Sequence, residues 1–277
     1  MESRSNTDIQ KHIISQLNVS PNIDPNEEIG RRIKFLCEYM NNSGQHTLVL
    51  GISGGVDSTV AGKLAQLAVE EAREQGMGAR FVAMRLPYGE QKDEADAQRA
   101  LDYIAPDETL TVDIRPASDA MLVTLEESGL GFSDEAHRDF VLGNIKARQR
   151  MVAQFAVAGA RGGLVIGTDQ GAEAVMGFFT KFGDGACDLI PLEGLNKRQV
   201  RAIGKALDAP SELIEKQPTA DLESLSPQKT DESALGISYD EIDDFLEGRE
   251  VSGKAYTTIF DAYFKTEHKR SLPVAPR

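Results

Sequence analysis

Short apolar segments alternate with amphipathic segments along the first two thirds of the chain, and this alternation constrains the fold more than any other feature. The apolar segments are residues 46–51, 80–84, 109–114 and 163–167. The segments with a helical spacing of apolar residues are 58–74, 93–104 and 144–160. Strands that alternate with helices form a parallel sheet with helices on both faces. We therefore predict an α/β fold with a doubly wound parallel sheet.

The segments on either side of this core are predicted to be mainly helical. Asp24 and Pro25 are typical of a helix start. The chain is mostly helical again after Pro191. A polar stretch at about 215–235 is long for a connection inside a compact domain, so we predict a functional or disordered loop there. A length of 277 residues favours one domain over residues 1–277.

The net charge of the chain limits its partners. It is −14 at pH 7, and such an acidic surface repels nucleic acids and anionic membranes. A small anionic substrate is compatible with it only if basic side chains reverse the field locally. No segment has the length and apolarity of a signal peptide or a membrane-spanning helix. Two distant cysteines, Cys37 and Cys187, are expected to pack in a reducing, cytoplasmic protein.

A turn rich in glycine and serine follows the first predicted strand. Residues 51–58 read Gly-Ile-Ser-Gly-Gly-Val-Asp-Ser. Glycines let the main chain approach a ligand, while serine hydroxyls and the free amides of a helix start donate hydrogen bonds to phosphate oxygens. A carboxylate such as Asp57 suits an anion site only if a divalent cation joins it to the phosphates. The turn matches neither the Walker A pattern nor the dinucleotide-binding pattern.

This turn resembles the pyrophosphate loop of the N-type ATP pyrophosphatases, the PP-loop superfamily. The resemblance implies the adenine nucleotide alpha hydrolase-like fold and a loop that holds the pyrophosphate leaving from ATP. GMP synthetases, argininosuccinate synthetases and tRNA-modifying enzymes share this loop. The loop alone therefore does not identify the second substrate.

Later segments resemble one family within this superfamily. The most specific are residues 177–185, Gly-Phe-Phe-Thr-Lys-Phe-Gly-Asp-Gly, and residues 267–270, Glu-His-Lys-Arg. Their order along the chain is similar to that of the NAD synthetase family over nearly the whole length. Because the phosphate loop begins at Gly51, we expect no amidase domain ahead of it. The resemblance is therefore to the short, ammonia-using branch of the family.

The resemblance implies a ligase that forms a C–N bond in the last step of NAD biosynthesis. The nicotinate carboxylate of deamido-NAD would attack the α-phosphorus of ATP and expel pyrophosphate, and ammonia would then displace AMP. A carboxylate lacks a good leaving group, which adenylation supplies, so the protein mainly positions reactants and stabilises charge. The family further implies Mg²⁺ as cofactor, ATP as co-substrate and a cytoplasmic homodimer.

The resemblance places an ATP site around the phosphate loop. Its residues would be Gly51, Ile52, Ser53, Gly54, Gly55, Val56, Asp57, Ser58, Arg85, Gln91, Thr168, Lys197 and Thr219. Asp57 and Glu173 would bind Mg²⁺, and Lys197 would neutralise pyrophosphate charge. The polar stretch at 215–235 would be a lid that excludes water from the acyl-adenylate.

A second set of residues is implied for deamido-NAD. It consists of Arg148, Lys181, Asp188, His268 and Lys269. Asp57 and Lys181 would be catalytic. The basic members of both sets supply the local positive charge that the acidic net charge requires. Four roles stay open, those of Gln91, Arg150, Asp169 and Asp184, and Arg150 competes with Arg148 as a substrate ligand.

Several of these residues also have simpler interpretations. Asp57 could cap the following helix, Glu173 could lie on a helix surface, and Lys197 could be a solvated residue at a helix start. The phenylalanines at 178, 179 and 182 could pack in a core, and His268 could be a surface residue.

Two other functions are compatible with the loop. One is another ATP pyrophosphatase, such as a tRNA-modifying enzyme, which would want a basic surface for RNA. The other is a non-catalytic nucleotide-binding sensor, which would need neither Glu173 nor the cations beyond the loop.

Overall fold

A four-stranded parallel sheet lies at the centre of the molecule. The computed structural model describes residues 6–90, 93–219, 225 and 230–276. The strands are β1 (Thr47–Gly51), β2 (Arg80–Arg85), β3 (Glu108–Thr111) and β4 (Gly163–Val165), in the order β3-β2-β1-β4. In the register, Thr47 of β1 aligns with Arg80 on one side and with Gly163 on the other. The first three strands are added in one direction from β1 to β3, whereas β4 is added on the other side of β1. Proteins with α/β sheets bind ligands at the carboxyl ends of the two strands where the direction changes, here β1 and β4.

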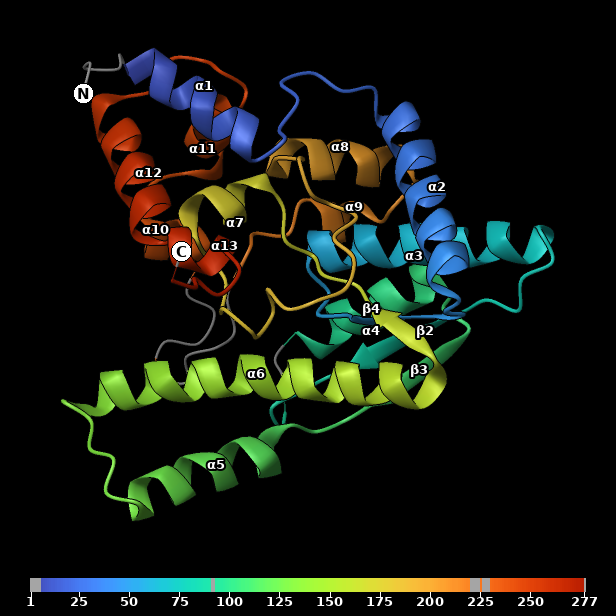
Figure 1. Cartoon of the computed structure of the whole chain (residues 1–277), viewed down its shortest axis with the longest axis horizontal. Helices are drawn as coiled ribbons and strands as arrows, with labels where there is room; N and C mark the ends of the chain where they lie inside the picture. Colours follow the sequence, from blue (N-terminus) through green and yellow to red (C-terminus); the bar gives the residue numbers. More distant parts are fainter. Residues whose placement is uncertain (1–5, 91–92, 220–224, 226–229, 277) are drawn as a thin grey trace.

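Helices cover both faces of this sheet (Figure 1). On one face lie α2 (Pro25–Ser43), α3 (Val56–Glu74), α4 (Glu94–Ile104) and α8 (Lys197–Ala206). On the other lies α6 (Glu135–Arg161), with α5 (Arg115–Glu127) packed behind it. Leu48 and Leu50 of β1 face the first layer, whereas Val49 faces the second, as the pleat of a strand requires. The predicted doubly wound α/β fold is confirmed.

A second group of helices packs beside the sheet around its own apolar core. It includes α1 (Asn6–Gln16), α7 (Gly171–Met176), α11 (Tyr239–Leu246) and α12 (Gly253–Lys265). Three short helices complete the described chain: α9 (Ser211–Ile214), α10 (Asp231–Leu235) and α13 (Glu267–Arg270). Helix α8 joins the two groups, because it contacts α2 and α3 on one side and α11 on the other.

Most predicted elements form, but several ends differ. Asp24 caps α2 as predicted, since its carboxylate accepts hydrogen bonds from the backbone N–H groups of residues 26 and 27. The third strand was predicted to reach residue 114, but it ends at Thr111, and α5 begins at Arg115. The helix predicted from residue 144 begins at Glu135, where the Asp134 carboxylate accepts from the His137 N–H at 2.7 Å.

Two further predictions need correction. Helices α1 and α5 were not predicted. The stretch at 215–235 was predicted as a loop throughout, but its last five residues form α10, capped by the Thr230 hydroxyl. In the portion of the chain that the structure describes, no helix is long and apolar enough to cross a bilayer.

Candidate functional site

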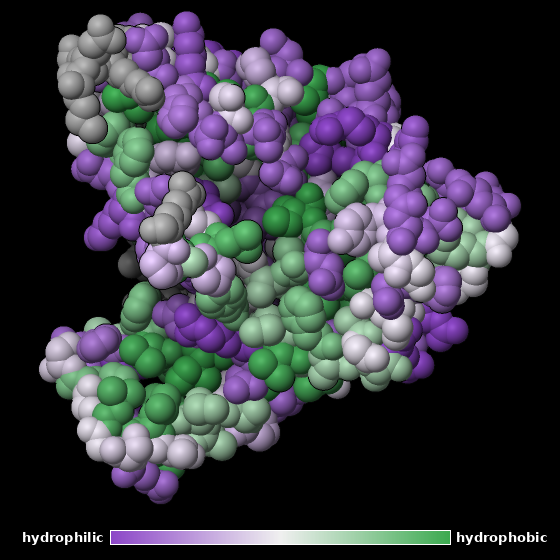
Figure 2. Space-filling view, in the orientation of Figure 1, coloured by the Kyte–Doolittle hydropathy of each residue, from purple (hydrophilic) through white to green (hydrophobic). Residues whose placement is uncertain are grey.

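A cavity of about 490 Å³ lies at the carboxyl ends of the strands. We call it the phosphate-loop cavity, because residues 51–53 and 55–58 line it. The far wall is built by α6, by residues 177–180 and by residues 216–219. In the space-filling view the surface is hollowed between α6 and the helical group around α12 (Figure 2).

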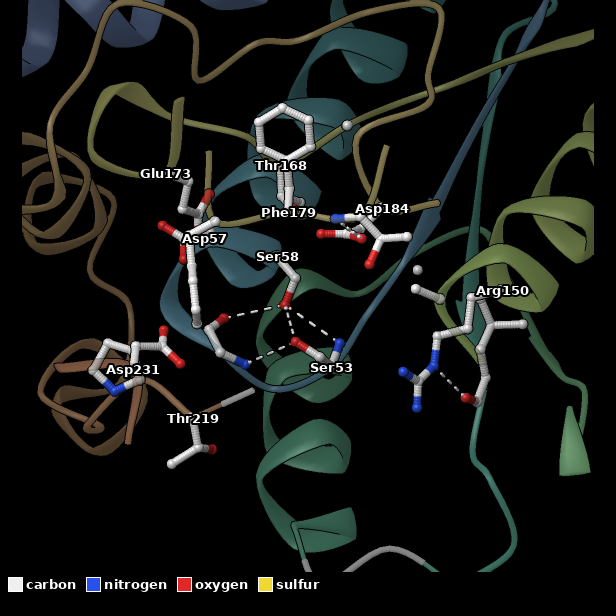
Figure 3. A pocket seen from close by; sticks show the side chains of 18 of the residues that line it. Ser53, Asp57, Ser58, Arg150, Thr168, Glu173, Phe179, Asp184, Thr219 and Asp231 are labelled. Carbon is white, nitrogen blue, oxygen red and sulfur yellow. Dashed lines mark hydrogen bonds between the residues drawn. The ribbon is translucent and has the colours of Figure 1, made fainter. Parts of the chain in front are cut away.

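Ser58 organises the loop at the edge of this cavity (Figure 3). Its Oγ donates to the carbonyl of Gly55 at 3.1 Å, lies 3.1 Å from Ser53 Oγ and accepts from the Ser53 N–H at 3.3 Å. The Gly55 N–H donates to Ser53 Oγ at 3.3 Å. The loop is thereby folded against the first turn of α3, whose N-terminal residues line the cavity. A helix N-terminus with free amides favours an anion such as a phosphate.

Gly54 allows the loop to approach α4. Its φ is +83°, and a Cβ built there would lie 2.6 Å from the backbone nitrogen of Ala97. Both the left-handed backbone and the contact with a neighbouring main chain require glycine. The loop is therefore held from behind by α4 as well as from within.

Asp57 and Glu173 line one wall of the cavity, and Lys197, which is fully buried and does not line it, contacts both carboxylates. Lys197 Nζ lies 2.7 Å from Asp57 Oδ2 and 3.6 Å from Glu173 Oε1. Lys197 is 0% exposed, so its interpretation as a solvated helix residue is wrong. The capping interpretation of Asp57 is also wrong, because Gly55 is the N-cap of α3 and Asp57 lies within its first turn.

The Glu173 side chain faces the cavity rather than solvent, which rules out its surface interpretation. It also closes a capping box at the start of α7, where Gln170 is the N-cap. Burial raises the pKa of Glu173 well above its usual range, against the influence of the Lys197 charge. Burial alone would lower the pKa of Lys197, but the charges of Asp57 and Glu173 outweigh it and raise that pKa to about 12.

Among the described residues, acidic side chains outnumber basic ones around this wall, where Asp57, Asp169, Glu173 and Asp184 influence one another and Lys197 is the nearby cation. Burial, together with the charges of Asp184 and Asp57, raises the pKa of Asp169 to about 8. Burial is the main cause of the raised pKa values of Glu173 and Asp169, and neighbouring carboxylates add to it; a bound cation would favour the charged forms of these groups. The wall would accept a further positive charge.

The two predicted metal ligands suit a magnesium ion. Asp57 Oδ1 is buried and has no hydrogen-bond partner among the described residues. The same part of the chain holds no group of three or more His, Cys, Asp or Glu side chains that would form a complete metal cage. Mg²⁺ usually takes one or two carboxylates and completes its octahedron with phosphate oxygens and water. Asp57 and Glu173 fit this kind of site.

The other predicted ATP residues line the same cavity where the structure describes them. Arg85 is 4% exposed and donates to the carbonyl of Ile52, and its Nη2 lies 2.6 Å from Glu94 Oε2. Thr168 and Thr219 also line the cavity. Gln91 lies outside the described residues.

A second cavity of about 360 Å³ adjoins the first. The two share the side chains of Phe140, Asn144, Thr180 and Lys269. Four of the five residues predicted for deamido-NAD line it: Arg148, Lys181, His268 and Lys269. We call it the basic cavity after these residues.

Hydrogen bonds to the main chain hold the basic residues in place. Lys269 Nζ donates to the carbonyls of Gly177 and Phe179, both at 2.8 Å. Lys181 Nζ donates to the carbonyl of His268, and Arg148 Nη2 donates to the carbonyl of Lys181 at 3.3 Å. The segment at 177–182 and the C-terminal helix α13 are thus joined at the junction of the two cavities.

Asp188 and Arg150 are placed differently from the other predicted ligands. Asp188 lines neither cavity, because its carboxylate turns back and accepts from the Val165 N–H at 2.8 Å. Arg150 lines the phosphate-loop cavity, and its Nε donates to the carbonyl of Leu86 at 3.1 Å. Arg148 and Arg150, the two alternatives for a substrate ligand, therefore line different cavities. Phe182 is 58% exposed, so its interpretation as a core residue is wrong.

Gln154 and Asp231 are among the polar residues of the cavity that were not predicted as site residues. Gln154 lines the cavity and accepts from the Gly51 N–H at 2.8 Å. Asp231 lines it too and accepts from the buried Tyr239 hydroxyl at 2.9 Å. The sequence feature that could have identified Gln154 is its spacing of four residues from Arg150, because residues four apart lie on the same face of a helix. Asp231 lies in a segment that the family resemblance covers, but the resemblance gave it no role, because its position depends on α10 and α11.

Comparisons with known proteins cover nearly the whole chain. The family model described as NAD synthase matches residues 28–273. The NH(3)-dependent NAD(+) synthetase of Streptomyces coelicolor is 61% identical over 268 residues, which are 97% of this chain and 97% of that protein. The crystal structure of NAD+ synthetase from Burkholderia pseudomallei has a TM-score of 0.86 at 55% identity and covers 99% of this chain and 100% of that one. The structure of NMN synthetase from Francisella tularensis has a TM-score of 0.79 at 36% identity, and the match covers 92% of this chain and 99% of that one.

Proposed function

We propose, since this chain belongs to the NAD synthase family, that it catalyses the ATP-dependent amidation of deamido-NAD by ammonia. The products are NAD, AMP and pyrophosphate. The observation that supports this most directly is the pair of adjoining cavities, one around a phosphate loop and one lined with cations. Two bound nucleotides would meet where the cavities share Asn144 and Thr180.

The phosphate-loop cavity is proposed to hold ATP. The amides and hydroxyls of residues 51–58 would bind the two phosphates that leave as pyrophosphate. Asp57 and Glu173 would hold Mg²⁺, which would supply charge neutralisation on those phosphates. The Lys197 ammonium, which contacts both carboxylates, would help to neutralise pyrophosphate charge from behind them. Thr168, Arg85 and Thr219 would lie on the surrounding walls.

The basic cavity is proposed to hold deamido-NAD. Arg148, Lys181 and Lys269 would bind its phosphates and carboxylate, and His268 would close the rim. The nicotinate carboxylate would then attack the α-phosphorus at the junction of the cavities, and ammonia would displace AMP. Lys181 would stabilise charge that develops at the reacting carboxyl group. Asp188 remains a weaker proposal as a ligand, because its carboxylate is engaged by β4.

The lid and the assembly are further parts of the proposal. The base of the predicted lid closes where Thr219 pairs with Thr230, at the wall of the phosphate-loop cavity. Protease sensitivity within 215–235 should fall when ATP, Mg²⁺ and deamido-NAD are added together. A homodimer in the cytoplasm is also proposed, and the two free thiols are compatible with a reducing compartment.

The decisive experiment measures NAD formed by the purified chain from deamido-NAD, ATP and Mg²⁺. One reaction contains an ammonium salt and a parallel one contains glutamine. NAD should form with ammonium and not with glutamine. A third reaction replaces deamido-NAD with nicotinate mononucleotide, because a structural neighbour is an NMN synthetase. Preference for the mononucleotide, or no pyrophosphate release with either substrate, would contradict the proposal.

A further inference from the structure

Helix α11 contacts Lys197 at both ends of that residue. Tyr239 and Asp243 are four residues apart on α11, so their side chains lie on the same face of the helix. We propose that Tyr239 is a positioning residue for the proposed reaction: it fixes the Lys197 ammonium against the metal-binding carboxylates and ties Asp231 to the same point. The identity of the ligand rests on the proposed function, whereas the positioning can be measured by binding alone.

The main-chain end of Lys197 is fixed by Asp243. The Asp243 carboxylate is 1% exposed and accepts from the backbone N–H groups of Lys197 and Arg198 at 3.1 and 2.8 Å. The N–H groups in the first turn of α8 have no acceptor within their own helix, so the Asp243 carboxylate acts as a cap that α11 supplies. The starting point of the Lys197 side chain is therefore set by α11.

The ammonium end of Lys197 lies against the Tyr239 ring. Nζ is 4.8 Å from the ring centroid, within the range of a cation–π contact. The same atom lies 2.7 Å from Asp57 Oδ2. A lysine side chain has four rotatable bonds, so a neighbouring ring restricts the directions in which its charge can point. Tyr239 is 3% exposed, so it forms a fixed wall behind the ammonium.

The hydroxyl of the same ring reaches the other side of the cavity. It donates to Asp231 Oδ2 at 2.9 Å, and Asp231 lines the phosphate-loop cavity. The Asp231 N–H donates to the carbonyl of Pro218 at 3.1 Å, next to the bridge between Thr219 and Thr230. In Figure 3, Asp231 and Thr219 lie on the same side of the cavity as Asp57 and Glu173. The Tyr239 side chain thus contacts both Asp231, which is bonded to the wall at 216–219, and Lys197, which is paired with Asp57 and Glu173.

Two substitutions separate the ring from the hydroxyl. Tyr239→Phe keeps the ring beside Lys197 and removes the bond to Asp231. Tyr239→Leu removes both. We expect the affinity for MgATP, measured by titration calorimetry without a second substrate, to fall about three- to tenfold in the Phe variant. In the Leu variant we expect a loss of about thirtyfold or more.

Tyr103, which is half-buried and packs against the main core, provides a control with the same types of contact. Its hydroxyl donates to the carbonyl of Leu207 at 2.8 Å, and Lys63 Nζ lies 5.1 Å from its ring. It lines neither of the two cavities described above. Tyr103→Phe and Tyr103→Leu should cost stability in the same way but leave MgATP affinity within about twofold of the wild type.

The outcomes separate this inference from the proposed function. Equal MgATP affinity in the folded Tyr239 and Tyr103 variants would overturn the positioning role. If Tyr239→Leu does not fold, the Phe variant decides alone, since it changes one hydroxyl. If wild type binds MgATP but forms no NAD, the proposed function fails and the binding series still tests Tyr239. With NAD formation intact, the KM for ATP should rise in Tyr239→Phe while the KM for deamido-NAD stays unchanged.

Discussion

Lys197 is fully buried although its sequence neighbours are polar. Its main partner, Asp57, is 140 residues away in the chain, so no local pattern could reveal the pair. A buried charge is tolerated only when it is paired, and removal of one partner leaves the other uncompensated. Lys197 therefore has a structural role in addition to the proposed role toward pyrophosphate.

A double-mutant cycle at Asp57 and Lys197 should show this coupling. Asp57→Asn and Lys197→Met should each lower the free energy of unfolding by about 3 kcal/mol. The double variant should lose about 1–3 kcal/mol less than the sum. Urea unfolding measures all three. Lys205→Met, which breaks an exposed 2.8 Å pair with Glu215, is the control and should cost less than about 1 kcal/mol. Additive losses at Asp57 and Lys197 would show that the pair is not coupled.

Asp169 should make stability depend on pH. Its pKa is raised to about 8, chiefly by burial and then by neighbouring carboxylates, whereas the unfolded chain has the ordinary value near 3.8. Between these values the folded state holds a proton that the unfolded state has lost, so stability falls as pH rises from about 4 to 8. Asp169→Asn mimics the protonated form. Without ligands, it should leave stability unchanged near pH 4 and raise it by on the order of 2 kcal/mol at pH 8. A gain of equal size at both pH values would contradict this assignment.

The site residues that could be predicted are those carried by contiguous motifs. The loop at 51–58 follows a strand and precedes a helix, so its position at the sheet edge follows from the sequence pattern alone. Gln154, Asp231 and Tyr239 reach the site because helices pack together, and each is a single polar residue within an ordinary amphipathic pattern. Asp188 shows the reverse: it follows the motif at 177–185 closely in sequence, yet its carboxylate accepts a hydrogen bond from the Val165 N–H of β4.

Helices and strands were predicted best where one face is fully buried. β1 and β2 are buried along nearly their whole length and lie within one residue of the predicted bounds. β3 is an edge strand with alternating exposure, so its short pattern did not fix where it ends. Helix α5 packs on α6 rather than on the sheet and buries only Ser118 and Leu122, which leaves little apolar periodicity to detect.

The contact between the phosphate loop and α4 should be sensitive to a single methyl group. Gly54→Ala adds a Cβ 2.6 Å from a backbone nitrogen of α4, at a φ of +83°. Gly44→Ala is a matched control, because φ there is +68° and nothing lies within 4 Å of the added Cβ. The control should cost about 1 kcal/mol of stability. Gly54→Ala should cost about 1–3 kcal/mol more and weaken MgATP binding. Equal stability and equal MgATP binding in the two variants would show that α4 does not constrain the loop.

Apolar side chains are exposed on the layer formed by α5 and α6. They include Met121 and Val123 on α5, at 45% and 47% exposure, and Val152 on α6, at 52%. Apolar surface gathers over these two helices in Figure 2. Exposed apolar surface can mark an association site. A self-complementary patch on both copies would give a twofold dimer.

The proposed homodimer can therefore be tested at this layer. Val152→Glu would place a charge within a buried apolar contact, and the variant should elute as a monomer at concentrations where wild type is a dimer. Phe35→Lys is the control, because Phe35 is also exposed, at 40%, but lies on α2, on the opposite side of the molecule (Figure 1). It should remain a dimer. Light scattering coupled to size exclusion measures both. A monomeric wild type would contradict the homodimer, and a dimeric Val152→Glu beside a monomeric Phe35→Lys would move the interface to α2.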